Sequence, residues 1–396
     1  MRLSDATRTT FRTHAPAVVQ APVRALLVGM AFAACGVKSP PTTVEPPAPL
    51  TAVGRTYAVG DTLFRRDARW MGGDAAISIE LSNARTLWLF GDSFVSLVTP
   101  ATRTNAKLPR NTIAIQSGRD PTTSTMTFAW NALNASTPTS FFPDVGTNWY
   151  WPGGGLRFVE GPLAVFLTAV RSTPGIGLGF TVSGYALAVI DNPDASPNAW
   201  RVRIVDGPAL PFDATPATAV VRVGDNVVAL AVPQNGSKRG FLVRYAASAL
   251  IAGTLTGAQW WMGDARGWVA TSSVGAGGPA AVMDDAGAEC SLHFDSAHNL
   301  FVHVASYGFG ATTIGMRTAP AITGPWSTPT TVYRPPESDA AAPFVYAGKA
   351  HPMLAAPAGD LLVTYVANSF TFADLLTANG QRTLYWPRFA ALHFNR

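Results

Sequence analysis

Cysteine and charged residues are scarce in this chain of 396 residues. The sequence has two cysteines, Cys35 and Cys290, and only 13% of its residues are charged. This number of cysteines excludes a disulfide-rich scaffold, and no Cys-x-x-Cys pattern for a metal or redox site is present. Because Cys35 directly follows a leader-like segment and is predicted to be modified, no intramolecular disulfide is expected, and Cys290 is predicted to be a buried thiol.

Long stretches rich in Leu, Glu and Lys are also missing, which disfavours helices. The sequence instead has 36 glycines and 31 prolines. Valine, threonine and alanine are common between them. This composition is typical of short strands joined by many turns. The chain is long enough for two or three domains, but all-β folds of this size often form one.

The apolar run at residues 25–34 is too short to cross a bilayer, which requires about 20 residues. It follows basic residues and ends in small ones, as a secretory signal does. Phe32-Ala33-Ala34-Cys35 resembles a bacterial lipobox, after which Cys35 would carry lipid. We predict a signal peptide at 1–34 and a lipoprotein at a bacterial membrane, either periplasmic or on the cell surface. The alternative is an ordinary signal peptide with a chance cysteine.

The positive charge of the chain lies largely in this leader. Four arginines and one aspartate precede Cys35, so removing the leader takes three from the net charge of +5 and leaves about +2. No cluster of Lys and Arg remains to bind a phosphate backbone, so nucleic acid is not an expected partner. Residues 35–54 are rich in Pro and Thr and are predicted to form a linker. Residues 55–396 are predicted to be one domain, and the protein is predicted to be a monomer.

The domain contains five repeats of an apolar strand, a polar turn and a second apolar strand. The predicted hairpins are 75–81 with 86–90, 156–159 with 163–167, 217–223 with 227–231, 290–294 with 300–304, and 351–355 with 361–365. Further strand-like sequence follows each hairpin. Four strands per unit and five units predict an all-β, five-bladed β-propeller. The alternative is a β-sandwich with insertions, which does not explain the regular spacing.

In a propeller, the start of each innermost strand and the end of its hairpin partner lie at the same rim. We call the opening inside this rim the mouth. Three of the 24 acidic residues, Asp74, Asp92 and Glu289, are expected there. Carboxyls crowded in this way shift one another's pKa, which can supply the acid and the base or nucleophile for glycosidic cleavage. The alternatives are that Asp74 and Asp92 cap turns and that Glu289 pairs with Lys or Arg.

Other residues near the mouth are candidates for binding a carbohydrate. Aromatic rings suit sugar faces, and polar side chains suit hydroxyls. The candidates are Trp70, Trp151, Arg171, Tyr307, Lys349, His351 and Asn368. For His351 the alternative is a buried core histidine. No metal-ligand pattern is present and no cofactor is predicted; a Ca²⁺ ion in the channel is conceivable but has no support in the sequence.

Four short segments resemble a known family, and two of them, Gly287-Ala-Glu289-Cys-Ser-Leu-His293 and Tyr346-Ala-Gly-Lys349-Ala-His351-Pro352, resemble its later blades. Trp70-Met-Gly-Gly-Asp74 and Leu87-Trp-Leu-Phe-Gly-Asp92-Ser93-Phe94 are similar to the first blade of five-bladed propeller glycoside hydrolases, closest to the endo-D-arabinanase-like family. The resemblance implies a polysaccharide substrate such as arabinan or a related furanoside. It implies catalytic roles for Asp74 and Asp92 first and Glu289 third. Ser93 stands where Thr is commoner. A non-catalytic propeller that binds a glycan or a protein remains the alternative function.

Overall fold

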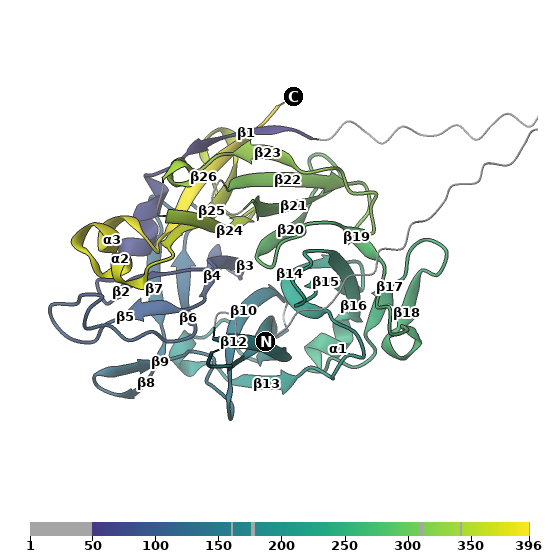
Figure 1. The fold of residues 1–396 in the computed structure, drawn as a ribbon, viewed down its shortest axis with the longest axis horizontal. Helices are drawn as coiled ribbons and strands as arrows, with labels where there is room; N and C mark the ends of the chain where they lie inside the picture. The colour runs from purple at the N-terminus through teal and green to yellow at the C-terminus, as the bar shows by residue number, and fades with distance from the viewer. Residues whose placement is uncertain (1–49, 160, 176–178, 309–311, 341–342, 396) are drawn as a thin grey trace, which may run out of the picture. The chain divides into compact units, whose positions relative to one another are not determined.

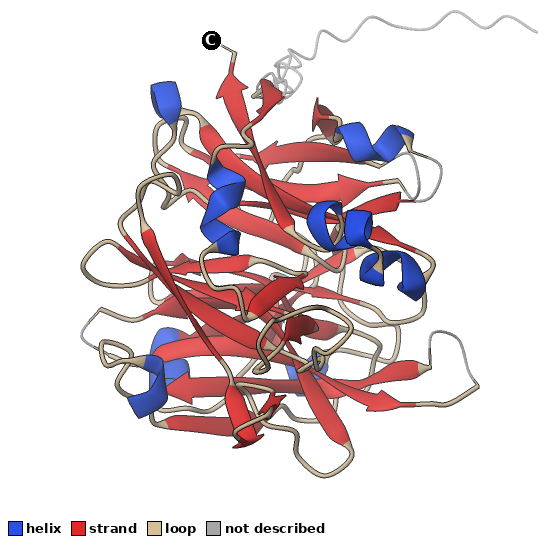
Figure 2. Ribbon diagram, turned by 90° about the vertical axis from the view of Figure 1, so that its left-hand side faces the viewer, coloured by secondary structure: helices blue, strands red, loops and turns tan. Residues whose placement is uncertain are grey.

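The computed structural model describes residues 50–395 other than 160, 176–178, 309–311 and 341–342. The predicted signal peptide, Cys35 and most of the predicted linker lie outside the described residues. Among the residues described, no helix has both the length and the apolar character needed to cross a membrane. Strands account for most of the regular structure, and the helices between them are short (Figure 2).

Five antiparallel sheets are arranged around a common centre, with one strand of each sheet innermost (Figure 1). The chain is therefore a five-bladed β-propeller, as predicted. Blade 1 contains β3 (Ile77–Glu80), β4 (Arg85–Phe90), β6 (Thr112–Ser117) and β7 (Thr125–Ala129). Blade 2 contains β10 (Asn148–Arg157), β11 (Leu163–Ser172), β12 (Phe180–Ile190) and β13 (Val202–Asp206).

Blade 3 is the most elaborate of the five sheets. It contains β14 (Thr215–Val223), β15 (Asn226–Val232), β16 (Gly240–Ala246), β17 (Gln259–Trp261), β18 (Trp268–Ala270) and β19 (Ala281–Met283). The short helix α1 (Ala247–Ile251) follows β16. Blade 4 contains β20 (Cys290–Asp295), β21 (Leu300–Tyr307), β22 (Thr313–Ala319) and β23 (Thr330–Tyr333).

Blade 5 joins the beginning and the end of the propeller. It contains β24 (Pro343–Ala350), β25 (Leu361–Ser369), β26 (Pro387–Phe394) and β1 (Ala52–Thr56) as the outer strand. Ala52 pairs with Phe394 and Thr56 with Ala390. The predicted linker therefore ends too late, because β1 begins inside the range 35–54. Linker-like composition concealed a strand whose pairing partner lies at the other end of the sequence.

In the part of the chain that the structure describes, two small sheets and the helices α2 (Phe372–Leu376) and α3 (Ala378–Thr383) lie outside the blades. β2 (Trp70–Gly73) pairs with β5 (Ser93–Val95), and β8 (Asn131–Asn134) pairs with β9 (Thr137–Thr139). Helices α2 and α3 are inserted between β25 and β26. The β2–β5 pair and the α2–α3 insertion flank the residues that form the candidate site.

The predicted hairpins of blades 1, 3 and 4 match the observed strands within a few residues. In blade 2 the predicted inner strand at 156–159 overlaps only the last two residues of β10, and in blade 5 the predicted inner strand is misplaced. The prediction of a strand at 351–355 is wrong: the inner strand is β24, which ends at Ala350, and the following residues form a turn. The consecutive apolar residues at 353–355 have the composition of a strand, which led to the wrong prediction. The true strand is buried over Ala347–Ala350 and includes glycine and lysine, which weaken a composition-based signal.

Candidate active site

The side chain of Asp74 lies between β2 and β3, where the chain changes direction. Ala75 and Ala76, which follow it, have positive φ values of 63° and 50°. The hydroxyl of Tyr346 donates a hydrogen bond to Oδ2 of Asp74 at 2.8 Å. A Cβ on Gly91 would lie 2.3 Å from Oδ1 of Asp74, so only glycine permits this approach. The Asp74 carboxyl is thus held against the residue that immediately precedes Asp92.

The side chain of Asp92 lies between β4 and β5 and is 27% exposed. Nε1 of Trp151, on the inner strand of blade 2, lies 3.4 Å from its Oδ1. An Nη atom of Arg110 lies 3.6 Å from its Oδ2. The Arg110 guanidinium also stacks over the ring of Trp149, 4.5 Å from the ring centre. Asp92 therefore faces solvent partly and has one indole and one cation beside it.

Glu289 precedes β20 and reaches the same mouth from blade 4. Nζ of Lys349, at the end of β24, lies 3.3 Å from Oε1 of Glu289. The lysine side chain is only 2% exposed, whereas that of Glu289 is 34% exposed. Lys349 also donates a hydrogen bond to the carbonyl of Ala347 at 3.2 Å. The sequence alternative in which Glu289 pairs with a lysine is therefore realised, and the buried Lys349 is not free to bind sugar hydroxyls.

The three carboxyls interact electrostatically, and this interaction shifts the pKa of Asp74. Burial and the charges of Glu289 and Asp92 together raise the pKa of Asp74 to about 8, although hydrogen bonds from Tyr346 and Tyr385 oppose the rise. Burial also raises the pKa of Asp92, but the charge of Arg110 and the hydrogen bond from Trp151 oppose that rise. The structure thus brings together the three acids singled out from the sequence. Their catalytic roles stay predictions at this point.

Two tyrosines complete the surroundings of Asp74, and the sequence reasoning missed both. Tyr346 is the hydrogen-bond donor to Asp74, and Tyr385 donates a hydrogen bond to the backbone carbonyl of Asp92 at 3.0 Å. The pKa of each is raised well above 10 by burial and by the charge of Asp74, so both hydroxyls stay protonated. Tyr346 could have been noticed because it precedes Lys349 by three residues, whereas Tyr385 follows the unpredicted α3.

A buried arginine holds Tyr385 in place. Arg103 is 2% exposed and donates hydrogen bonds to the carbonyls of Met71, at 2.8 Å, and Leu384, at 2.7 Å. It thereby ties the α2–α3 insertion to β2. Tyr385 itself has a φ of 62°, a left-handed conformation that is unfavourable for a tyrosine. The fold therefore fixes a strained residue directly beside two of the carboxyls.

Two further predicted residues belong to this cluster. Trp151 contacts Asp92, as described, and its ring also packs edge-on against Phe180. Asn368 donates a hydrogen bond from Nδ2 to the hydroxyl of Tyr346 at 3.2 Å, and its Oδ1 accepts one from the backbone of Ser369. Asn368 therefore holds the hydroxyl of Tyr346 in position, and its amide is engaged within the protein.

The expectation that Trp70 and His351 bind sugar is wrong. Trp70 is 0% exposed, and its ring stacks on Phe128 at 4.6 Å within the core of blade 1. Both ring nitrogens of His351 are bonded inside the protein, to Ser78 at 2.6 Å and to Thr364 at 2.7 Å. Burial lowers the pKa of His351 to about 3, so it is a neutral core histidine. Both side chains lie in the protein interior, so neither can contact a ligand at the mouth.

Tyr307 and Arg171 are not connected to the carboxyls among the described residues. The hydroxyl of Tyr307 accepts a hydrogen bond from Nε of Arg317 at 3.1 Å, and its ring covers Gly315. Arg171 lies exposed near the end of β11, opposite Asn148. Cys290 is a buried free thiol, as predicted, and burial raises its pKa to about 12.

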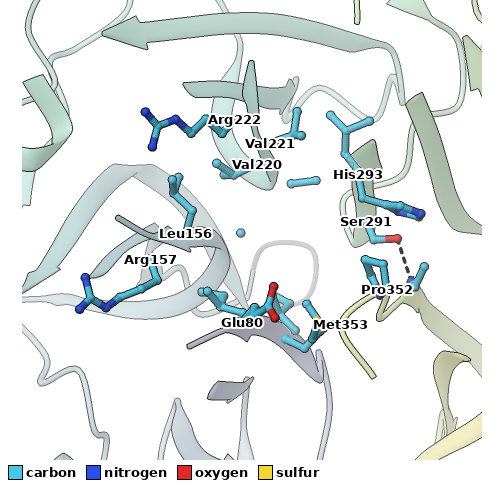
Figure 3. A pocket seen from close by; sticks show the side chains of 18 of the residues that line it. Glu80, Leu156, Arg157, Val220, Val221, Arg222, Ser291, His293, Pro352 and Met353 are labelled. Carbon is cyan, nitrogen blue, oxygen red and sulfur yellow. Dashed lines mark hydrogen bonds between the residues drawn. The ribbon is translucent and has the colours of Figure 1, made fainter. Parts of the chain in front are cut away.

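A cavity of about 710 Å³ occupies the centre of the propeller below this cluster. Residues of all five inner strands line it, and Figure 3 shows Glu80, Leu156, Val220, His293 and Met353 around it. The lining runs along the inner strands and includes Ile77 at the start of β3, Cys290 at the start of β20, and Lys349, which is paired with Glu289. The lining is mainly apolar and excludes Asp74 and Asp92, so the cavity is not where the carboxyls would act. Within the described part of the chain, no group of three His, Cys, Asp or Glu side chains could hold a metal ion.

A family model described as "Domain of unknown function (DUF5005)" matches residues 59–393. A solved structure from Bacteroides ovatus, described only as a candidate hydrolase, is similar with a TM-score of 0.67 and 17% identity, covering 87% of this chain and 93% of that one. A GH62 α-L-arabinofuranosidase catalytic domain from Coprinopsis cinerea gives a TM-score of 0.44 and 10% identity, covering 88% and 97%. An exo-β-1,3-galactanase from Phanerochaete chrysosporium gives 0.46 and 11%, covering 88% and 64%. Among curated proteins no match was found.

Proposed function

The chain belongs to the DUF5005 family, a domain of unknown function, and from that premise we propose that it is a glycoside hydrolase acting through Asp74 and Asp92. The observation that carries this proposal is the contrast between the two carboxyls. Asp74 is partly exposed and has the hydroxyl of Tyr346 beside it, and its pKa of about 8 keeps it protonated near neutral pH. Asp92 is partly exposed and has the cation of Arg110 beside it. Two carboxyls with different protonation are what glycosidic cleavage requires.

The two acids then have distinct roles. Asp74 gives its proton to the glycosidic oxygen as the bond from that oxygen to the anomeric carbon breaks. Asp92, ionised, either takes a proton from the water that attacks this carbon or bonds to the carbon itself. Glu289 is paired with Lys349, and its negative charge helps to keep Asp74 protonated. In this scheme Glu289 supports Asp74 and is not itself the proton donor.

The proposed substrate is a polysaccharide of furanose sugars such as arabinan. The resemblance of residues 70–74 and 87–94 to propeller endo-D-arabinanases supports this choice. Export and lipidation at Cys35 belong to the same proposal, because they would hold the enzyme on a bacterial membrane where such polymers are met.

The test is sugar release from soluble arabinan by a protein that begins at Leu50. We expect Asp74→Asn and Asp92→Asn each to lower the rate about 100-fold or more, since each removes an acid or base from the reaction. Asp213→Asn is the matched control, because Asp213 is an exposed acid just before the inner strand of blade 3 that accepts a hydrogen bond from the backbone N–H of Gln234. Unchanged sugar release by Asp74→Asn would remove that residue from the mechanism.

A non-catalytic glycan-binding propeller is the second candidate. The ion pairs of Glu289 with Lys349 and of Asp92 with Arg110 favour it, because engaged carboxylates are less available for proton transfer. A wild-type protein that is retained by arabinan in a native gel but releases no sugar from it would support this candidate instead.

A further inference from the structure

Three aromatic rings lead from the solvent to the carboxyl of Asp74. Phe370 is 65% exposed, and its ring stacks on that of Phe344 with centres 4.4 Å apart and planes at 30°. Phe344 in turn lies 5.4 Å from Tyr346, also at 30°. The hydroxyl of Tyr346 is bonded to Asp74. The rings thus form a continuous row that ends at the proposed proton donor.

The strand geometry of blade 5 produces this row. Phe344 and Tyr346 are two residues apart on β24, so their side chains lie on the same face of the sheet. Phe344 pairs with Asn368 on β25, and Phe370 follows directly after that strand. The two-residue spacing and the register therefore place Phe370 beside Phe344 at the strand ends nearest the mouth.

Phe370 is a large apolar side chain that is nevertheless mostly exposed. A single exposed apolar side chain is ordinary in a soluble protein. Here, however, the exposed ring is stacked on a second ring and is continuous with a cluster of carboxyls. Aromatic faces beside a few polar groups are typical of ligand sites. The C–H faces of sugar rings are apolar and weakly positive, which suits the negative face of an aromatic ring.

We propose that Phe344 and Phe370, here called the aromatic platform, bind a sugar ring of the glycan next to the residue that is cleaved. This inference rests on the proposed function and makes it more specific. The substrate is a chain of several sugars that extends from the carboxyls over the mouth end of blade 5. A glycoside with one sugar would not reach the platform and would be a poor substrate.

The experiment measures binding and hydrolysis separately. Binding is measured by retardation in native gels that contain soluble arabinan, arabinogalactan or xylan, with Asp74→Asn in every protein so that the polymer stays intact. We expect Phe370→Ala and Phe344→Ala to raise the dissociation constant about tenfold. Phe294→Ala should bind like the parent, because Phe294 is also exposed, at 44%, but lies at the opposite end of an inner strand. Phe370→Ala removes an exposed ring and should fold normally even if Phe344→Ala does not.

With Asp74 restored, hydrolysis distinguishes this inference from the proposed function. We expect Phe370→Ala to raise KM about tenfold for the polymer and to change kcat less than about twofold. Normal binding and normal KM in both platform variants would overturn the platform and leave the hydrolase intact. If Phe370→Ala abolishes retention by the polymer, and the protein with Asp74 intact releases no sugar, the platform is supported and the hydrolase is overturned. A parent that is retained by none of the three polymers would overturn the platform.

Discussion

At the scale of single residues, Asp74 is the most unfavourable group in the mouth. Its carboxyl lies near two other carboxyls that raise its pKa, and it abuts a glycine that cannot be replaced without a clash. An acid with a purely structural role is normally paired with a cation and is not placed among other carboxyls. Asp360 shows the difference: it is fully buried, but Arg55 lies 2.5 Å away and His393 2.9 Å away. Strongly shifted carboxyls of the Asp74 kind are concentrated at functional sites.

The pH dependence of activity should report the protonation of Asp74. A group that must donate a proton works below its pKa, so kcat/KM should fall as pH rises through about 8. The hydrogen bond from Tyr346 favours the ionised form and lowers the pKa of Asp74. Tyr346→Phe should therefore move the alkaline limb of the profile upwards, by about one pH unit.

The matched control for this substitution is Tyr307→Phe. It removes a hydroxyl that is bonded to Arg317 instead of to a carboxyl, and the pH profile should not change. The measurement is kcat/KM on arabinan from about pH 5 to about pH 10. An alkaline limb that stays in place or moves down in Tyr346→Phe would contradict the assignment of Asp74 as the proton donor.

At the scale of strands, the sequence predicted what depends on local pattern. The hairpins of blades 1, 3 and 4 have apolar strands on either side of polar turns, and the structure places them within a few residues. The acids that follow or precede these strands could therefore be predicted to lie near one another, because their positions depend on the same hairpins. What failed depends on distant partners. β1 needs β26 to become a strand, and Tyr385 reaches the mouth only because Arg103 ties its segment to β2.

The glycines of β10 show a second dependence on tertiary packing. A Cβ on Gly153 would lie 1.9 Å from the carbonyl oxygen of Ala217 on β14, so these inner strands touch through their backbones. Gly153→Ala should lower the free energy of unfolding by about 1–3 kcal/mol, since the strands must separate. Gly184→Ala, on β12, is the control because a Cβ there would meet nothing within 4 Å. Urea denaturation of both variants measures the effect, and equal midpoints would refute the close contact.

At the scale of the whole propeller, the ring is closed by pairing its first strand with its last. β1 covers the edge of β26, and the buried Asp360 links Arg55 on β1 to His393 on β26. A protein that begins at Tyr57 lacks β1, so it should melt several degrees lower than one that begins at Leu50. The exposed edge of β26 should also make it aggregate more readily. Equal melting temperatures in thermal scans would show that β1 does not contribute to closure.

The position of β1 also bears on how the propeller would be held at a membrane. β1 begins at Ala52, so residues 36–51 would separate a lipid on Cys35 from the outer edge of blade 5. If Cys35 is lipidated, bacteria that express the chain and are fed radioactive palmitate should label it, and the labelled protein should sediment with membranes. Cys35→Ser should abolish both results. Cys290→Ser should change neither, because that thiol is buried and its pKa is raised to about 12, which leaves it unreactive. Labelling that persists in Cys35→Ser would contradict the anchor, and loss of membrane association in Cys290→Ser would point to a fault in folding instead of a missing lipid.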